Sequence, residues 1–312
     1  MMNRVLFCIW SLTVMLLAQL LGSSQVHGAL VQDEKLTDSK KQAEALQKKR
    51  DKINVLLPAA AKAFESGDYE KAFANAKKIC ELAPDDFRLQ SFLGEVSFAS
   101  GEFETCVTAY DAMIRIAPSI EPSLWQRGLA LYYADRFEDG VKQFETHQTV
   151  NSQDVENAVW HLLCAARVSD VDAARKRLIP ITGDTRVPMS QVYEMFAGRM
   201  APDEVLKASL ETSARVQEGG EGHRLQQYYA HLYIGLYHEM LGKNELAIAS
   251  LKKAKEINPL GKMNFMGQVA RVHLDLREKQ ANESSEKPMD KKKSGKETGK
   301  AEADKEKSSF DD

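Results

Sequence analysis

The chain has 312 residues with a formal net charge of −3, four cysteines and 43% hydrophobic residues. A charge so near zero argues against a nucleic-acid partner, whose phosphates need a strongly basic surface. Four cysteines are too few to replace an apolar core with a disulfide framework, so we expect one elongated domain of about 250 residues between two terminal segments.

Residues 1–29 have the composition of a secretory signal peptide. Arg4 gives a positive start, an apolar run covers residues 5–21, and small and polar residues follow it. Cleavage after Gly28 or Ala29 predicts an exported protein, periplasmic or secreted, without a membrane span. The alternative is an uncleaved membrane anchor, because the run is close to the roughly 17–25 residues of a spanning helix.

A helical pattern starts at Asp38 and continues to Pro58, where we expect a kink or a new helix. We predict that residues 30–52 form an N-terminal capping helix over the array that follows. A cap is expected because an open array of stacked helices exposes apolar faces at both ends.

Residues 53–154 repeat with a period of 34, which predicts three pairs of antiparallel helices. Gly67 recurs as Gly101, and Asp135 takes the third equivalent place. Glycine adopts the left-handed conformation that ends the first helix of a pair, and aspartate tolerates this conformation better than most residues. Other echoed positions carry similar residues: Tyr69, Phe103 and Phe137; Pro84 and Pro118; Gly94 and Gly128.

The period is interrupted over residues 155–220, where we expect a degenerate repeat around Trp160 and then short irregular helices. It returns over residues 221–278 as a last repeat, with Gly235 and Gly242 at repeat positions, and a C-terminal capping helix. Valine and isoleucine do not alternate over any bounded run, so no strand is expected. The prediction is an all-α solenoid of about fourteen helices with an irregular helical insert before the last repeat.

Residues 279–312 contain nine lysines, nine acidic residues and one aromatic residue, Phe310. Because such a segment cannot bury enough apolar surface to offset the entropy lost on ordering, we predict a disordered charged tail. Its lysine run at residues 291–293 is short and is flanked by acids, so it does not indicate nucleic-acid binding.

The repeats at residues 53–154 and 228–261 resemble the tetratricopeptide repeat superfamily. Residues 124–133, Trp160 and the irregular stretch 174–196 are further similar to the NlpI-like exported bacterial proteins and related cyanobacterial and plastid proteins. This resemblance implies a non-enzymatic scaffold, with a homodimer left open, that serves as an adaptor for envelope proteases or cell-wall hydrolases. The lipoprotein members carry a lipidated cysteine at the mature terminus. No cysteine lies at either cleavage point of this sequence, so the identity of the partner does not carry over.

In this superfamily the first helices of the pairs line a concave groove, and the resemblance places the groove wall at fixed repeat positions. The implied groove residues are Arg88, Glu95, Trp125, Tyr132, Tyr133 and Tyr229. Aromatic side chains bury a large area at a low entropic cost, so this wall suits a protein or peptide ligand. Two alternatives stay open: some of these residues pack within the protein, or the groove is self-occupied in a self-associating structural protein of the cell envelope.

No pattern in the sequence predicts catalysis, a cofactor or a metal ion. His231 and His238 are seven residues apart on one predicted helix, roughly 10 Å, which is too far to share a metal. His161 precedes Cys164 by three residues, but the sequence nearby offers no orienting acid or oxyanion site. No phosphate-binding glycine loop, HExxH motif or nucleophile elbow occurs. The cysteines of the predicted domain are expected to be reduced core thiols: Cys80, Cys106 and Cys164.

Overall fold

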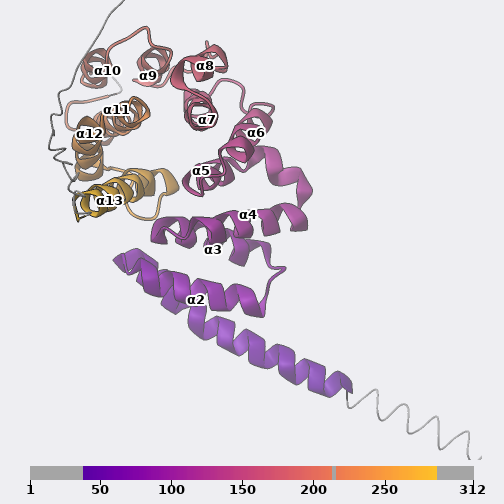
Figure 1. Cartoon of the computed structure of the whole chain (residues 1–312). Helices are drawn as coiled ribbons and strands as arrows, with labels where there is room; N and C mark the ends of the chain where they lie inside the picture. The colour runs from indigo at the N-terminus through magenta and orange to yellow at the C-terminus, as the bar shows by residue number, and fades with distance from the viewer. Residues whose placement is uncertain (1–37, 213–215, 287–312) are drawn as a thin grey trace, which may run out of the picture.

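The computed structural model describes residues 38–212 and 216–286, and these ranges contain helices and no strand. A long N-terminal helix over residues 38–66 is followed by twelve α-helices, labelled α2 to α13, and one 3-10 helix, η1 (Figure 1). The prediction of an all-α fold with about fourteen helices is confirmed. Within the described ranges, no helix is both long and apolar enough to cross a membrane. The predicted signal at residues 1–29 lies outside them.

Neighbouring helices pack as pairs in the register that the sequence period predicts. The N-terminal helix pairs with α2 (Tyr69–Leu82), α3 (Phe87–Ser100) with α4 (Phe103–Ile116), α5 (Trp125–Tyr133) with α6 (Phe137–His147), α7 (Val155–Val168) with α8 (Val171–Lys176), and α11 (Glu221–Met240) with α12 (Asn244–Ile257). The other helices are η1 (Pro118–Ser123), α9 (Met189–Phe196), α10 (Pro202–Ser209) and α13 (Phe265–Glu286). Helices α9 and α10 belong to the predicted insert.

Four of the pairs turn at a residue in the left-handed region of backbone conformation. Gly67, Gly101 and Gly242 have φ angles of 85°, 79° and 71°. Asp135 turns the third pair at φ 57° and is the one non-glycine residue with a positive φ in the part of the chain that the structure describes. The predicted turn at Asp135 is therefore confirmed, with aspartate in a conformation that most side chains disfavour.

The two helices of a pair approach closely where a glycine faces a large side chain sixteen residues later. A Cβ atom on Gly94 would lie 2.6 Å from the ring of Tyr110, which is well inside van der Waals contact. Two other pairs repeat this contact: Gly128 with Phe144, and Gly235 with Leu251. The recurrence of this contact explains why the sequence keeps glycine at this point of the period.

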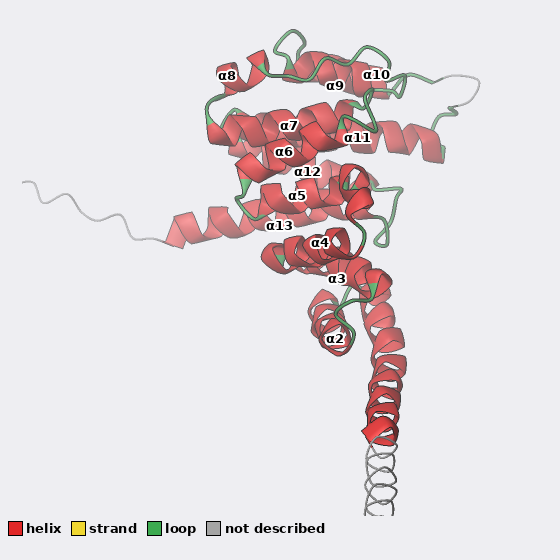
Figure 2. Ribbon diagram, turned by 90° about the vertical axis from the view of Figure 1, so that its right-hand side faces the viewer, coloured by secondary structure: helices red, strands yellow, loops and turns green. Residues whose placement is uncertain are grey.

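The N-terminal helix differs from the prediction. It runs unbroken through Pro58 from residue 38 to residue 66, so no separate capping helix precedes the first pair. Residues 38–52 are exposed and extend away from the array (Figure 2). This stretch is rich in lysine and has few apolar residues to bury, so it lengthens the first helix without covering the end of the array.

Helix α13 also extends further than expected. It ends at Glu286, so the first residues of the predicted disordered tail, 279–312, are helical. Lys279 and Glu283 form an ion pair of 4.0 Å one turn apart, a spacing that stabilises a helix. The rest of the predicted tail, residues 287–312, lies outside the described residues.

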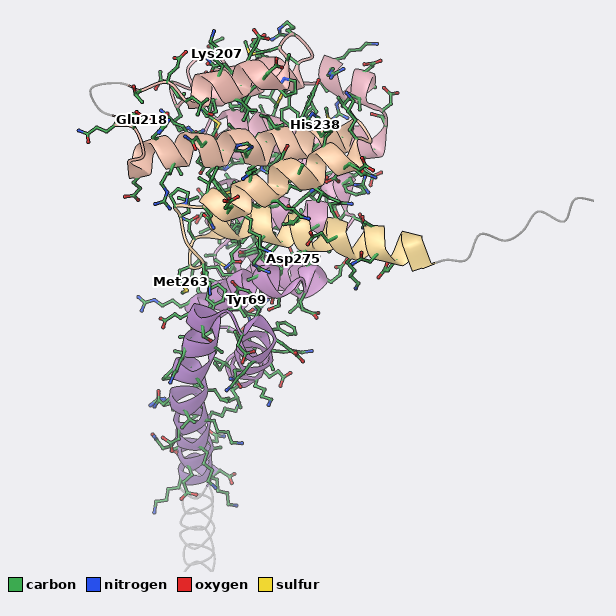
Figure 3. All side chains as sticks on the ribbon, turned by 90° about the vertical axis from the view of Figure 1, so that its left-hand side faces the viewer. Tyr69, Lys207, Glu218, His238, Met263 and Asp275 are labelled. Carbon is green, nitrogen blue, oxygen red and sulfur yellow. The ribbon has the colours of Figure 1, made fainter. Side chains whose placement is uncertain are left out.

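The array of helices is curved, so that its last helix, α13, packs against α3 near its start. Figure 1 shows helices α3 to α13 around a common centre, with α13 returning to the side of α3. The insert continues this path, because α9 packs on α7 and α10 packs on α11. One large apolar core therefore fills the inside, from Phe98 on α3 to Leu274 on α13. Figure 3 shows the junction, with Asp275 on α13 and Tyr69 at the start of α2.

Replacing Gly94 by alanine should destabilise the protein by about 1–2 kcal/mol. The added methyl group would overlap the Tyr110 ring, and the cost of this overlap exceeds the gain in helix propensity. The free energy of unfolding in urea measures this cost. The same substitution in a Tyr110→Leu background should cost less, since the ring that it meets is gone. An equal cost in both backgrounds would contradict the assigned contact.

Candidate functional site

The structure separates the residues that were predicted to line one groove. Arg88 is exposed at the start of α3, and Glu95 on the same helix is half-buried, where burial raises its pKa above the ordinary value. Tyr132 and Tyr133, at the end of α5, are only 4% and 8% exposed. These four residues therefore do not form one accessible wall.

Tyr132 and Tyr133 are covered by other helices of the same chain. The hydroxyl of Tyr133 is hydrogen-bonded to Nδ1 of His273 on α13 at 2.9 Å. The ring of Tyr132 meets the ring of Trp160 on α7 edge-on. Helix α13 thus occupies the place where the sequence predicted a ligand. These two tyrosines follow the alternative that the sequence left open, which is packing within the protein.

Glu239 on α11 is the acceptor in a buried polar cluster beneath α13. It is hydrogen-bonded to His273, and it forms an ion pair with Nη2 of Arg277 at 3.0 Å. Arg167 on α7 lies 4.0 Å from the same carboxylate. Burial by itself raises the pKa of Glu239, but its interactions with His273 and the two arginines outweigh burial, so the pKa lies below its ordinary value. The cluster joins α7, α11 and α13.

A pocket of about 320 Å³ remains open between α5 and α7, beside the start of α13. Its apolar walls are Trp125 and Leu129 from α5, Trp160 from α7 and Met266 from α13. Trp125 is half-buried, and its ring meets that of Phe265 edge-on with the centroids 5.5 Å apart. Of the six predicted groove residues, Trp125 is the one that lines this pocket.

The pocket also has polar lining residues, which come from the end of η1, the end of the third helix pair and the start of α7. Asp154 caps the N-terminus of α7, and its Oδ1 accepts from the backbone N–H of Glu156 at 3.0 Å. Nδ1 of His147 donates to the carbonyl of Pro122 at 2.7 Å, because a carbonyl oxygen can only accept. The polar lining residues are Ser123, His147, Asn151, Asp154, Glu156 and Asn157.

Arg186, in the segment between α8 and α9, fastens the insert to the start of α7. Its guanidinium group lies 2.6 Å from carboxylate oxygens of Asp154, Glu156 and Asp184. Oε2 of Glu156 also accepts from the hydroxyl of Tyr233 at 2.7 Å. Burial raises the pKa of Glu156, and the attraction of Arg186 offsets this only in part.

Tyr229, on α11, lies next to this group of charges. Its ring stacks on that of Tyr233, with the centroids 6.2 Å apart and an angle of 13° between the planes. Burial raises the pKa of Tyr229, and the negative charge of Glu156 adds to the increase. Tyr229 itself does not line the pocket of Trp125, whereas Glu156 does.

The chemistry of these side chains suits binding. In the ranges described, no group of three metal-ligating side chains is placed to hold an ion. His161 contacts Glu145 at 3.3 Å. The three cysteines within the described ranges are buried and form no disulfide, as predicted, and burial raises the pKa of Cys80 to about 12. Thiols of this kind stay protonated and unreactive.

Sequence reasoning missed most of this pocket. Asp154 and Glu156 precede an apolar run, a pattern that marks the start of a helix but does not indicate a pocket beside it. Arg186 lies 30 residues from Glu156 along the chain, and only the path of the insert brings the two together. Trp160 carried part of the resemblance, without any sign that it faced a site.

Residues 229–259 match the tetratricopeptide repeat family, and they cover most of α11 and all of α12. The search of curated proteins found no match to the chain. Two solved structures are similar to it. One is the MamA protein, at 15% identity over 66% of this chain and 92% of that chain, with a TM-score of 0.38. The other is a tetratricopeptide repeat protein from Parabacteroides merdae, at 14% identity over 72% of this chain and 84% of that chain, with a TM-score of 0.42. Scores this low carry no argument, so the assignment depends on the matched repeat and on the helix pairs themselves.

Replacing Glu239 by glutamine should destabilise the protein by about 3 kcal/mol at neutral pH, because it leaves Arg277 beside a buried neutral group. The pKa of Glu239 in the folded protein lies below the ordinary value of 4.5. Its contribution is therefore present above that value and is lost as the pH falls through the folded pKa. Urea unfolding between about pH 7 and pH 2 should show the difference between wild type and variant shrinking in acid. A difference independent of pH would contradict this assignment.

Proposed function

This is a tetratricopeptide repeat protein, and from that premise we propose that it binds a segment of a partner protein in the pocket between α5 and α7. The observation that carries the proposal is the position of Trp125, which is at a groove position of the third repeat and lines an open pocket. The close contact of Gly128 with Phe144 holds the two helices behind this wall together.

The size of the pocket suits one side chain of a partner protein, together with parts of the residues that flank it. Its volume of about 320 Å³ is near the lower end of the roughly 300–1,000 Å³ found for ligand sites. A longer groove is closed, because α13 covers Tyr133 and its neighbours. Apolar walls with a few polar groups are typical of sites that fix both the depth and the direction of a ligand. We therefore expect an extended segment, anchored at one residue.

The same proposal includes the location and the role of the protein. We propose that it is exported and that it serves as an adaptor for envelope proteases or cell-wall hydrolases. The apolar run at residues 5–21 supports export. The resemblance of residues 174–196 to the NlpI-like proteins supports the adaptor role. In this protein the same stretch contains Arg186, which pairs with two carboxylates that line the pocket, those of Asp154 and Glu156.

Replacing Trp125 by alanine should weaken capture of partner proteins from an envelope extract of the native organism. Loss of an aromatic anchor in a pocket typically costs about 2 kcal/mol or more, which corresponds to a roughly 30-fold lower affinity. Quantitative mass spectrometry over a range of bait concentrations measures the change. Tyr193→Ala, on α9 and outside the pocket, is the matched control. Unaltered capture by the Trp125 variant, with helicity preserved in circular dichroism, would rule out this site.

A second candidate function is that of a self-associating structural protein, and the N-terminal helix favours it. Leu46, Ile53 and Leu57 line a hollow of about 470 Å³ beside the start of α3, together with the predicted groove residue Arg88. Leu46 is 56% exposed, so a second copy that covered it would remove apolar surface from water. This surface is distinct from the pocket of Trp125.

Under this second candidate, Leu46→Ser should convert a dimer of the full chain into a monomer, because it removes apolar surface from the proposed contact. Light scattering measures the mass directly. Val55 is 71% exposed on the same helix but lies nine residues further on, half a turn out of phase with Leu46, so Val55→Ser is the control. A monomeric wild type, or a dimer that Leu46→Ser leaves intact, would exclude this mode of association.

A further inference from the structure

We propose that the side chain which enters the pocket is cationic, a lysine or an arginine of the partner segment. The inference rests on the proposed function, because it names the chemistry of the ligand that the same pocket takes. Three features of the pocket carry it: a surplus of negative charge, a buried acceptor without a donor, and walls that include two tryptophans.

The surplus of charge arises where three carboxylates meet one guanidinium group at the start of α7. Arg186 contacts Asp154, Glu156 and Asp184, and among the described residues no other cation forms an ion pair with any of them. The N-terminus of α7 supplies a further positive charge of about one half. With its carboxylates ionised, the group keeps a net negative charge of roughly one and a half.

This negative charge lies at the pocket. Asp154 and Glu156 both line it, whereas none of the lining residues is a lysine or an arginine. Their side chains are 19% and 14% exposed, compared with 48% for that of Arg186. The two carboxylates are therefore more buried than the cation that pairs with them. In such partly dehydrated surroundings they attract a second cation more strongly than they would in water.

Asn157 adds an acceptor that is independent of the carboxylates. Its amide nitrogen donates to the carbonyl of Phe144 at 3.2 Å and to Oε1 of Gln148 at 2.9 Å, which fixes the orientation of the amide. Its Oδ1 is buried without a donor in the described part of the chain, and the residue, 3% exposed, lines the pocket. Because buried acceptors are almost always paired, this oxygen offers a place for an N–H group of a ligand. The indole N–H of Trp160, on another wall of the pocket, is likewise buried without a partner among the described residues.

The apolar walls match the rest of a basic side chain. Trp125 and Trp160 provide aromatic rings, which attract a cation, and Leu129 and Met266 provide surface for its methylene groups. An apolar ligand side chain would dehydrate the two carboxylates without pairing them, and an acidic one would be repelled. Shape and charge together therefore favour a lysine or an arginine.

Attachment of the insert to α7 explains only part of this arrangement. Asp184, within the insert itself, orients Arg186 through two parallel contacts of 3.0 and 2.6 Å, and Asp154, the cap of α7, already takes a contact from Arg186. Glu156 adds a second contact between Arg186 and α7. The raised pKa of its buried carboxyl group shows that Arg186 and Tyr233 compensate its charge incompletely. A cationic ligand would complete that compensation.

Random seven-residue peptides displayed on phage and selected on the full chain test the inference. The pocket ligands are those peptides that bind the wild type and are lost on the Trp125→Ala variant. We expect them to be enriched in lysine or arginine at one position. One such peptide is then synthesised with lysine at that position and with norleucine, which has a neutral side chain of similar length. The wild type should bind the lysine peptide about 10-fold more tightly or better.

Glu156→Gln should bring the ratio of the affinities for the lysine and norleucine peptides closer to one, because glutamine keeps the shape of the side chain and removes its charge. Its affinity for the norleucine peptide should rise rather than fall, because one carboxylate that an apolar side chain dehydrates is gone, and this shows that the pocket is intact. Glu65→Gln, an exposed carboxylate on the N-terminal helix, should leave the preference as in the wild type. If Glu156→Gln fails to fold, the wild type alone tests the inference. Its affinity should be highest for the lysine peptide, lower for the norleucine peptide and lowest for a peptide with glutamate at the same position.

The outcomes separate the inference from the function on which it rests. Peptides that depend on Trp125 but lack a basic residue, or equal binding of lysine and norleucine, would overturn the cationic ligand while peptide binding stands. Absence of any peptide that depends on Trp125 would overturn the proposed function, and the inference with it.

Discussion

The return of α13 to the start of the array determines which surfaces this protein presents to a partner. Beneath α13, Glu239 is hydrogen-bonded to His273 and forms an ion pair with Arg277, and the hydroxyl of Tyr133 on α5 is hydrogen-bonded to the same histidine. Because these groups are buried, each relies on the others for its hydrogen bonds. An open solenoid would expose its concave face along its whole length. This chain instead fills most of that face with its own last helix.

The pocket exists at the edge of this closure. Helix α13 covers the tyrosines of α5 but only borders Trp125, through Phe265 and Met266. The remaining side is built by α7, whose first turn the insert holds in place through Arg186. The irregular insert is therefore more than a break in the repeat. It supplies Arg186, which pairs with the carboxylates of Asp154 and Glu156 that line the pocket.

Features that depend on neighbouring residues were predictable from the sequence, and those that depend on distant contacts were not. The turn at Asp135 lies within one period, so the 34-residue spacing revealed it. The same spacing marked Gly94 as a repeat position, but not that its backbone faces the ring of Tyr110. The hydrogen bond between Tyr133 and His273 joins residues 140 positions apart in the sequence, and no local pattern predicts it. A groove assigned from repeat positions alone therefore placed buried tyrosines on an open wall. It found the pocket only at one residue, Trp125, because the charged side comes from Asp154 and Glu156 at the start of α7, which are not among the groove positions of the repeat.

The central claim is that this pocket receives a segment of another protein, and site-specific photo-crosslinking in the native organism tests it most directly. A photoreactive phenylalanine analogue replaces Ser123, an exposed residue that lines the pocket, or the distant exposed residue Glu65. Mass spectrometry then identifies the cross-linked peptides. The account predicts that position 123, but not position 65, cross-links to one defined segment of a partner. Cross-links from position 123 only to the protein's own helices, or the same partner segment captured from both positions, would contradict it.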